Sequence, residues 1–196
     1  MEIILLRHGK PEIEMKGRFN PEEWREFLKK YDEVHVDPKS LPSSEALEIA
    51  SSSDVVVCSE LLRSSESAKI LGVKKIDFEN ALFNESPMPH GLFKRLRLTL
   101  LEWTVFYRIA QWFGYTIGTN ETGREGNVRA LECANLLVEL ARSNKKVLHV
   151  GHYGLNSYIA VHLLKMGWAG NRGYYQKHWE FWRFKYSGDL KKAMKG

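Results

Sequence analysis

The chain has 196 residues, enough for one domain with a substantial hydrophobic core, and we expect a single domain spanning residues 1–196. Its apolar content of 43% and charged content of 27% are typical of globular proteins, and no apolar run approaches the ~20 residues of a membrane span. The net charge of +5 is modest and the basic residues form no long stripe, so neither nucleic acid nor a membrane is an expected partner.

The two cysteines, Cys58 and Cys133, belong to no CxxC pair and lie in apolar periodic segments. Both are therefore expected to be buried thiols in a reducing compartment rather than zinc ligands or a disulfide. The N-terminus lacks a basic region followed by a long apolar stretch, so no signal peptide is expected. These features together predict a cytoplasmic protein.

Short β-branched runs alternate with helical patterns along the chain. Strands are predicted at 2–7, 55–59, 74–78, 147–151 and, last, 180–186. Helices are predicted at 21–31, 43–50, 61–71, 98–113, 128–142 and 155–166, with Gly114 and Gly167 as C-caps. This alternation predicts an α/β fold with three layers, α/β/α, around a mostly parallel central sheet.

The segment 86–126 interrupts the alternation and is predicted to be a cap inserted over the ligand crevice. It contains two prolines, many aromatic residues and the helix at 98–113. Trp103, Phe106, Tyr107 and Trp112 are expected to contribute to a wall of the crevice; the alternative is that they are core residues. That alternative is better for Trp112, because it shares an apolar helix face with Leu98, Leu101, Val105 and Ile109.

Four polar residues follow predicted strands. His8 follows the first strand, Arg63 the second, Glu85 the third and His152 the fourth. In parallel sheets, ligands bind outside the carboxyl ends of the strands, so these four side chains are predicted to meet at one edge.

His8 is the candidate nucleophile. It stands in Arg7-His8-Gly9, directly after the apolar run Ile3–Leu6, and Gly9 would let the backbone approach a ligand closely. Neutral imidazole attacks phosphorus and leaves readily, which divides one difficult displacement into two easier steps. For this, the second ring nitrogen must carry its proton in a hydrogen bond.

Arg7 and Arg63 offer planar, permanently charged guanidinium groups for phosphoryl oxygens. His152 opens a helix, where free backbone N–H groups and the helix dipole favour an anion. Arg18 and Lys10, in the loop after the first strand, could add positive charge to the site or could be solvated surface residues. His149, inside its strand, is expected to pack against a neighbour.

Glu85 is the candidate general acid. Cleavage of a phosphate ester needs a proton on the leaving oxygen, and hydrolysis of the intermediate needs a base for water, roles that one carboxyl can fill in turn. The sequence contains no clustered metal-ligand set and no GxxxxGK[ST] loop, so we expect a metal-independent reaction without a cofactor.

These residues resemble the histidine phosphatase superfamily, also called the phosphoglycerate-mutase-like family. The resemblance covers roughly residues 2–166 and rests on four motifs in order: Leu5-Leu6-Arg7-His8-Gly9, then Ser59 to Arg63 with Ser67-Ala68, then Asn84-Glu85, and the apolar strand that ends at His152. It implies a phosphohistidine on His8, a phosphoryl group held by Arg7, Arg63 and His152, and proton donation by Glu85. The implied enzyme is a phosphoric monoester hydrolase acting on a small phosphorylated substrate.

Two departures from the family pattern bear on the activity. Mutase-like members usually continue Arg-His-Gly with Glu-Ser or Glu-Thr and a later asparagine, whereas this chain has Lys10-Pro11 and Glu14. Tyr153 follows His152 where the family commonly has glycine; its backbone N–H can still bind phosphate, and its ring could narrow the pocket or stack on a substrate. The first departure favours a phosphatase over a phosphomutase. A phosphomutase and a catalytically silent domain that binds phosphorylated ligands remain the alternatives.

Overall fold

The fold is built around a six-stranded sheet with the strand order β3-β2-β4-β1-β6-β5. The computed structural model describes residues 1–14, 16–93 and 95–186. The strands are β1 (Glu2–Arg7), β2 (Val55–Cys58), β3 (Phe78–Glu79), β4 (Lys146–Gly151), β5 (Ala169–Gly170) and β6 (Phe181–Lys185). The pairs β1/β4, β4/β2 and β2/β3 are parallel, whereas β6 pairs antiparallel with β1 and with β5. The predicted mostly parallel sheet is confirmed.

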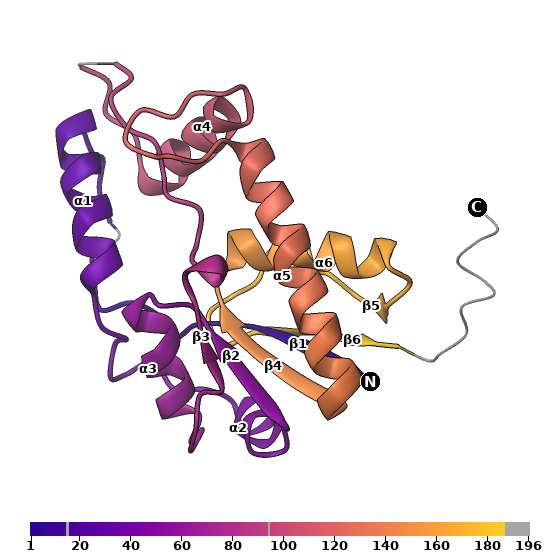
Figure 1. The fold of residues 1–196 in the computed structure, drawn as a ribbon. Coiled ribbons are helices and arrows are strands. Elements are labelled where there is room, and N and C mark those ends of the chain that lie inside the picture. The colour runs from indigo at the N-terminus through magenta and orange to yellow at the C-terminus, as the bar shows by residue number, and fades with distance from the viewer. Residues whose placement is uncertain (15, 94, 187–196) are drawn as a thin grey trace.

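Helices cover both faces of the sheet (Figure 1). They are α1 (Pro21–Glu33), α2 (Ser44–Ser51), α3 (Leu62–Ile70), α4 (Leu100–Trp112), α5 (Gly123–Asn144) and α6 (Tyr153–Lys165), with the short 3-10 helix η1 (Ala81–Phe83) after β3. Ile3 and Leu5 of β1 pack in a core with α5 and α6, whereas Ile4 and Leu6 pack in a second core with α2 and α3. Because side chains alternate across a strand, one apolar run serves both cores, and the three-layer prediction is confirmed.

Local capping signals explain where several helices begin. Asn20, Thr99 and Thr122 each cap the first turn of α1, α4 and α5, and a glutamate three residues later completes a capping box in all three. Hydrophobic periodicity alone predicted that α5 begins at residue 128; the capping box extends it to Gly123. Gly114 and Gly167 follow α4 and α6 with positive φ, as expected of C-terminal caps.

The strand predicted at 74–78 is wrong in its bounds, because only Phe78 and Glu79 pair with β2. Just before them, Asp77 bonds to Val56 of β2 in two ways: its backbone N donates to the carbonyl of Val56 at 2.9 Å, and its side-chain Oδ2 accepts from the backbone N of Val56 at 3.0 Å. Because the carboxylate takes the place of a backbone acceptor, the regular pairing starts only at Phe78.

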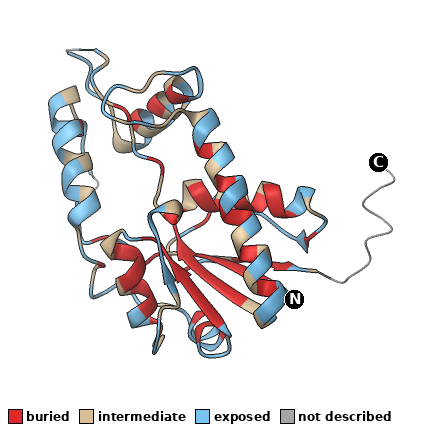
Figure 2. Ribbon diagram, viewed as in Figure 1, coloured by how far each residue is buried: buried red, intermediate tan, exposed pale blue. Residues whose placement is uncertain are grey.

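A separate aromatic cluster joins α1 to α4 beyond the carboxyl ends of the strands (Figure 1). Trp24 of α1 stacks on Trp103 and Tyr107 of α4, with ring centroids 6.3 Å and 6.0 Å apart, and all three side chains are buried. Figure 2 shows α1 otherwise largely exposed. Met88, Leu92 and Leu98, from the chain between Glu85 and α4, pack on this cluster.

The predicted core face of α4 is wrong. Leu101, Val105 and Ile109 are more than half exposed and Trp112 is 43% exposed, whereas Trp103 and Tyr107 are buried. Aliphatic periodicity pointed to one face, but stacking with Trp24 and hydrogen bonds from the ring nitrogens bury the aromatic face instead.

Within the described part of the chain, no helix is both long and apolar enough to cross a membrane.

Candidate phosphoryl-transfer site

His8 and His152 meet because they follow neighbouring parallel strands in register. Arg7 of β1 is paired with Gly151 of β4, and the backbone N of His8 donates to the carbonyl of Gly151 at 2.9 Å. The two imidazole rings lie 5.0 Å apart between centroids, and both side chains are buried. The strand order thus brings together residues that are 144 positions apart in the sequence.

The hydrogen bond of His8 determines its tautomer. Its Nδ1 lies 2.7 Å from the carbonyl oxygen of Gly9. A carbonyl only accepts, so Nδ1 carries the proton and Nε2 keeps the lone pair. This is the arrangement that a nucleophilic imidazole needs.

The electrostatic surroundings keep His8 neutral. Its pKa lies well below the ordinary value of 6.5, first because burial removes water from the ring and then because Arg63 and Arg7 repel a second positive charge. At neutral pH the ring is therefore uncharged and able to attack an electrophile.

The chain segment before β6 holds Arg7 in place. Its Nη1 donates to the carbonyl of Gln176 at 2.6 Å and to the hydroxyl of Tyr175 at 2.7 Å. The rings of Tyr175 and Tyr153 lie 5.3 Å and 5.8 Å from its Cζ atom, close enough for cation–π contacts. Tyr153 therefore contacts Arg7 rather than standing free, and its hydroxyl donates to the carbonyl of Tyr174 at 2.9 Å.

Arg63 is held from the opposite side by the end of α1. Its Nη1 donates to the carbonyl of Tyr31 at 2.9 Å and lies 3.4 Å from Oδ1 of Asp32, and its Cζ lies 4.5 Å from the centre of the Tyr31 ring. The side chain is only 1% exposed. A buried guanidinium needs compensating partners, and α1 supplies them.

Ser59 orients His152. Its hydroxyl lies 2.7 Å from Nε2 of His152 and accepts from the backbone N of Leu61 at 3.3 Å. A tautomer in which the Ser59 hydroxyl donates to Nε2 places the imidazole proton on Nδ1, where it can donate to a ligand. Burial, followed by the charges of His8 and Arg63, lowers the pKa of His152 well below its ordinary value, so the ring is a neutral donor.

Three buried nitrogens of the predicted site residues around His8 have no hydrogen-bond partner among the described residues. They are Nε of Arg7, Nε of Arg63 and Nδ1 of His152. Leaving such groups unpaired costs free energy, and native proteins rarely do so without a ligand or water to pair them. Since two carry positive charge, an anion is the partner that suits them.

Glu85 lies at the N-terminus of α6, next to His152. Its Oε2 accepts from the backbone N of Gly154 at 2.9 Å, and its Oε1 accepts from the backbone N of Ser86 at 3.1 Å. A Cβ atom on Gly154 would stand 2.6 Å from Oε1 of Glu85, so the carboxylate fits only beside a glycine. Arg108 of α4 lies 3.7 Å from the same oxygen.

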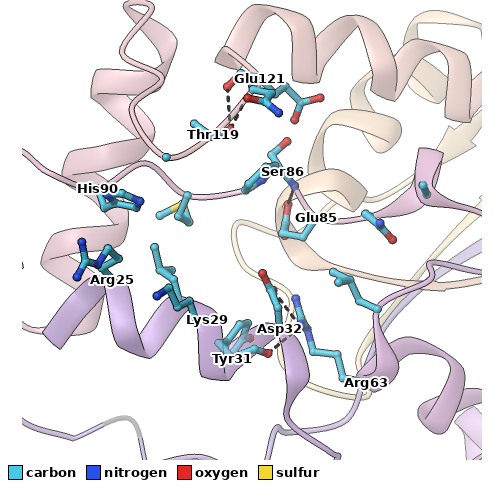
Figure 3. Close-up of a pocket in the computed structure, with 18 of the residues that line it drawn as sticks. Arg25, Lys29, Tyr31, Asp32, Arg63, Glu85, Ser86, His90, Thr119 and Glu121 are labelled. Carbon is cyan, nitrogen blue, oxygen red and sulfur yellow. Dashed lines mark hydrogen bonds and ion pairs between the residues drawn. The ribbon is translucent and has the colours of Figure 1, made fainter. Parts of the chain in front are cut away.

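Arg63 and Glu85 open into a cavity of about 700 Å³ between α1 and the chain segments around residues 84–90 and 118–121. Figure 3 shows Arg63 and Asp32 below Glu85 and Ser86, with Arg25, Lys29 and His90 toward the other end. Its volume is typical of sites for small organic ligands. The predicted aromatic wall is wrong: Trp103, Phe106, Tyr107 and Trp112 do not line this cavity, and Tyr31 supplies its aromatic ring.

Gly9 is packed too tightly against its neighbours for a side chain at this position. A Cβ atom there would lie 2.4 Å from the ring of Trp179 and 2.6 Å from Val36, and the Gly9 N–H donates to Ser67 at 2.8 Å. The guanidinium of Arg18 donates to the carbonyl of Arg97 at 3.1 Å, and Arg18 does not line the cavity. Lys10 lies 3.9 Å from Asp37.

The sequence did not point to a third imidazole. The ring of His178 lies 5.5 Å from that of His8, and its Nε2 is buried without a partner in the described part of the chain. Burial, with Arg7 and Lys10 nearby, lowers the pKa of His178 to about 3. It comes from the loop before the antiparallel strand β6, which the rule for parallel strands does not cover.

The described residues contain no group of three or more His, Cys, Asp or Glu side chains arranged to hold a metal ion.

Neither the protein-family models nor the curated proteins gave a match to this sequence. Solved structures do match, and the neighbours belong to the histidine phosphatase superfamily. A putative α-ribazole-5'-P phosphatase from Escherichia coli has a TM-score of 0.59 at 16% identity, with 93% of this chain and 89% of that one covered. The mycobacterial glucosyl-3-phosphoglycerate phosphatase Rv2419c has a TM-score of 0.57 at 16% identity over 94% and 96% of the two chains.

Phosphoserine phosphatase from Entamoeba histolytica has a TM-score of 0.51 at 20% identity, covering 84% of this chain and 80% of that one. The chain thus shares the phosphoglycerate-mutase-like fold of these phosphatases, as the sequence motifs predicted.

Proposed function

We propose that this protein is a metal-independent histidine phosphatase that hydrolyses a small phosphomonoester through a phosphohistidine on His8. The observation that carries the proposal is the set of unpartnered, buried nitrogens on Arg7, Arg63 and His152 beside a neutral His8. A tetrahedral phosphoryl group presents several acceptor oxygens to such donors, and the two guanidinium groups supply the positive charge that a metal ion would otherwise bring.

In the first step, Nε2 of His8 attacks phosphorus and the bond to the leaving oxygen breaks. A proton from the carboxyl of Glu85 passes to that oxygen and releases an alcohol. Water then attacks the phosphohistidine, Glu85 takes one of its protons, and inorganic phosphate leaves with His8 restored. Arg7, Arg63 and His152 hold the phosphoryl oxygens through both steps.

The shared fold supports membership of the histidine phosphatase superfamily, and the phosphatases among the neighbours support hydrolysis of small phosphorylated compounds. The two buried, unbridged cysteines fit a reducing compartment such as the cytoplasm.

The test is turnover of a panel of phosphomonoesters in the presence of a chelator by the wild type and by His8→Ala. We expect the wild type to release phosphate and to form an acid-labile phosphoenzyme, and the variant to lose at least ~10³-fold in kcat with no phosphoenzyme. His35→Ala, which removes an exposed histidine paired with Glu66, is the matched control and should keep full activity.

Full activity of His8→Ala, or an absolute need for added metal, would overturn the mechanism. A stable phosphoenzyme that isomerises its substrate faster than it releases phosphate would identify a phosphomutase instead. Tight binding of phosphorylated ligands without any phosphoenzyme would identify a silent binding domain.

A further inference from the structure

The cavity is larger than a phosphoryl group needs, and its outer end is lined by different residues from the end at the phosphoryl site. Arg63 and Glu85 line the end of the cavity nearest the phosphoryl site, whose residues His8, Arg7 and His152 lie outside the cavity lining. Arg25, Lys29 and His90 line the other end (Figure 3). A volume of about 700 Å³ accommodates a whole organic molecule, so the outer residues bear on which substrate fits.

The two ends of the cavity differ in their charge balance. Each acid in the lining has partners of its own: Glu121 pairs with Arg129 at 2.6 Å, Asp32 lies 3.4 Å from Arg63, and Glu85 accepts from the backbone N of Gly154. None of these acids contacts Arg25 or Lys29.

Arg25 and Lys29 have one acidic neighbour among the described residues, Glu26, at 3.7 Å and 3.3 Å. Glu26 is exposed and does not line the cavity. The ionised side chains that line the outer end are therefore both cations.

His90 is fixed opposite these two cations. Its backbone N donates to the carbonyl of Ile117 at 3.0 Å, and its own carbonyl accepts from the hydroxyl of Tyr115 at 2.9 Å. Gly118 packs so closely against the imidazole that a Cβ atom there would lie 2.2 Å from Nε2. Burial, and then the charges of Arg25 and Lys29, lowers the pKa of His90, as expected for a ring that faces two cations without an anion between them.

Helix α1 carries residues that belong to both ends of the cavity. Asp32 and Tyr31 hold Arg63, and Lys29 and Arg25 precede Asp32 by three and seven residues on the same helix. At a rise of 1.5 Å per residue, these positions lie ~5 Å and ~10 Å along the helix from Asp32.

We propose that Arg25, Lys29 and His90 bind a second anionic group of the substrate. The substrate class is then a phosphomonoester that carries a carboxylate or a second phosphate at the end remote from the scissile phosphate. This inference rests on the proposed phosphatase function and assigns the outer end of its cavity.

The test compares short alkyl phosphates of equal length whose far end carries a carboxylate, a phosphate or a neutral amide. The wild type should prefer the charged ends by roughly three- to tenfold in kcat/KM, the size expected of two exposed charge pairs. The double variant Arg25→Gln/Lys29→Gln should lose the preference and keep its turnover of the neutral substrate. Lys30→Gln, on α1 but outside the cavity lining, is the matched control and should retain the preference.

A parallel calorimetric titration with the corresponding alkyl phosphonates measures the same preference without turnover. Equal affinity for charged and neutral ends, or a preference unchanged in the double variant, would overturn the inference while leaving the phosphatase function intact. A binding preference that depends on Arg25 and Lys29, without turnover of any ester, would support the anion site and overturn the phosphatase function. The carboxylate and phosphate arms show which anion binds better.

Discussion

At the scale of single residues, the site is defined by which hydrogen bonds are made and which are left open. One ring nitrogen of His8 donates a hydrogen bond to the carbonyl of Gly9, so only the other nitrogen is available for chemistry. His152 uses one nitrogen on Ser59 and leaves the second for a ligand. A residue's identity suggests what it can do, but its bonding partners decide which atom does it.

Gly154 offers a direct test of the position of Glu85. Gly154→Ala places a methyl group 2.6 Å from the carboxylate and should displace it, which we expect to lower kcat by about 10²-fold for esters with poor leaving groups. Activated aryl phosphates should be affected much less, since their leaving group needs no proton. The fold should hold, because alanine is favourable in the first turn of a helix.

Steady-state kinetics with a leaving-group series, beside Glu85→Gln, checks this prediction. The matched control is Gly173→Ala, whose added Cβ meets nothing closer than 3.5 Å. Equal slowing of aryl and alkyl esters by Gly154→Ala would contradict a role for Glu85 as the proton donor.

At the scale of the elements, α1 links the aromatic cluster to the phosphoryl site. Its first turn carries Trp24, which stacks on α4, and its end carries the carbonyl of Tyr31 and the carboxylate of Asp32, which hold Arg63. Apart from Trp24, the residues of α1 are partly or fully exposed. Trp24, with Phe27 and Leu28 packed against the same cluster, therefore anchors a helix that orients a guanidinium in the site.

Trp24→Ala should loosen α1 and, through it, Arg63. We expect a loss of about 3–5 kcal/mol of packing at the cluster, greater hydrogen exchange across α1 and α4, and a higher KM. Hydrogen exchange and kinetics on the same preparation check this.

Trp112→Ala, at the partly exposed end of α4, is the control and should change hydrogen exchange and KM much less. Unchanged exchange in α1 of Trp24→Ala would show that contacts other than this cluster hold the helix.

At the scale of the whole molecule, three buried histidines and the partly buried His178 make the fold sensitive to acid. The pKa values of His149 and His178 are lowered to about 3, and those of His8 and His152 lie well below 6.5, with burial the main cause in each case. Below pH 6.5 the unfolded chain takes up protons that the folded protein refuses. Stability is therefore complete above that pH and is lost as the pH falls toward the folded-state values.

We expect the free energy of unfolding to fall steeply between pH 6.5 and pH 5, by up to ~1.4 kcal/mol per pH unit for each histidine. His149 provides the control, since it packs against Phe83 and both of its nitrogens are unpartnered. His149→Leu should reduce the slope by about one proton and make the protein more stable in acid. Urea unfolding at a series of pH values measures this, and an unchanged slope in the variant would contradict it.

The sequence predicted the layers because each layer depends on local patterns. The β-branched run before Arg7 reads as a strand buried on both faces, and the same reasoning holds for β2 and β4. Since parallel strands end at one edge, His8, Arg63, Glu85 and His152 could be placed there from their positions in the sequence.

Contacts between distant segments decided the rest. His178, Tyr175 and Gln176 reach Arg7 and His8 from a loop whose position depends on the antiparallel pairing of β6 with β1. Likewise, the aromatic face of α4 is buried because Trp24 lies against it, and the basic outer end of the cavity exists because α1 faces His90. The sequence by itself determined the strands, the helices and the edge of the sheet where the site lies, because these follow from local patterns. The tertiary structure decided which face of α4 is buried and which loop completes the site. Those two outcomes depend on contacts with segments elsewhere in the chain.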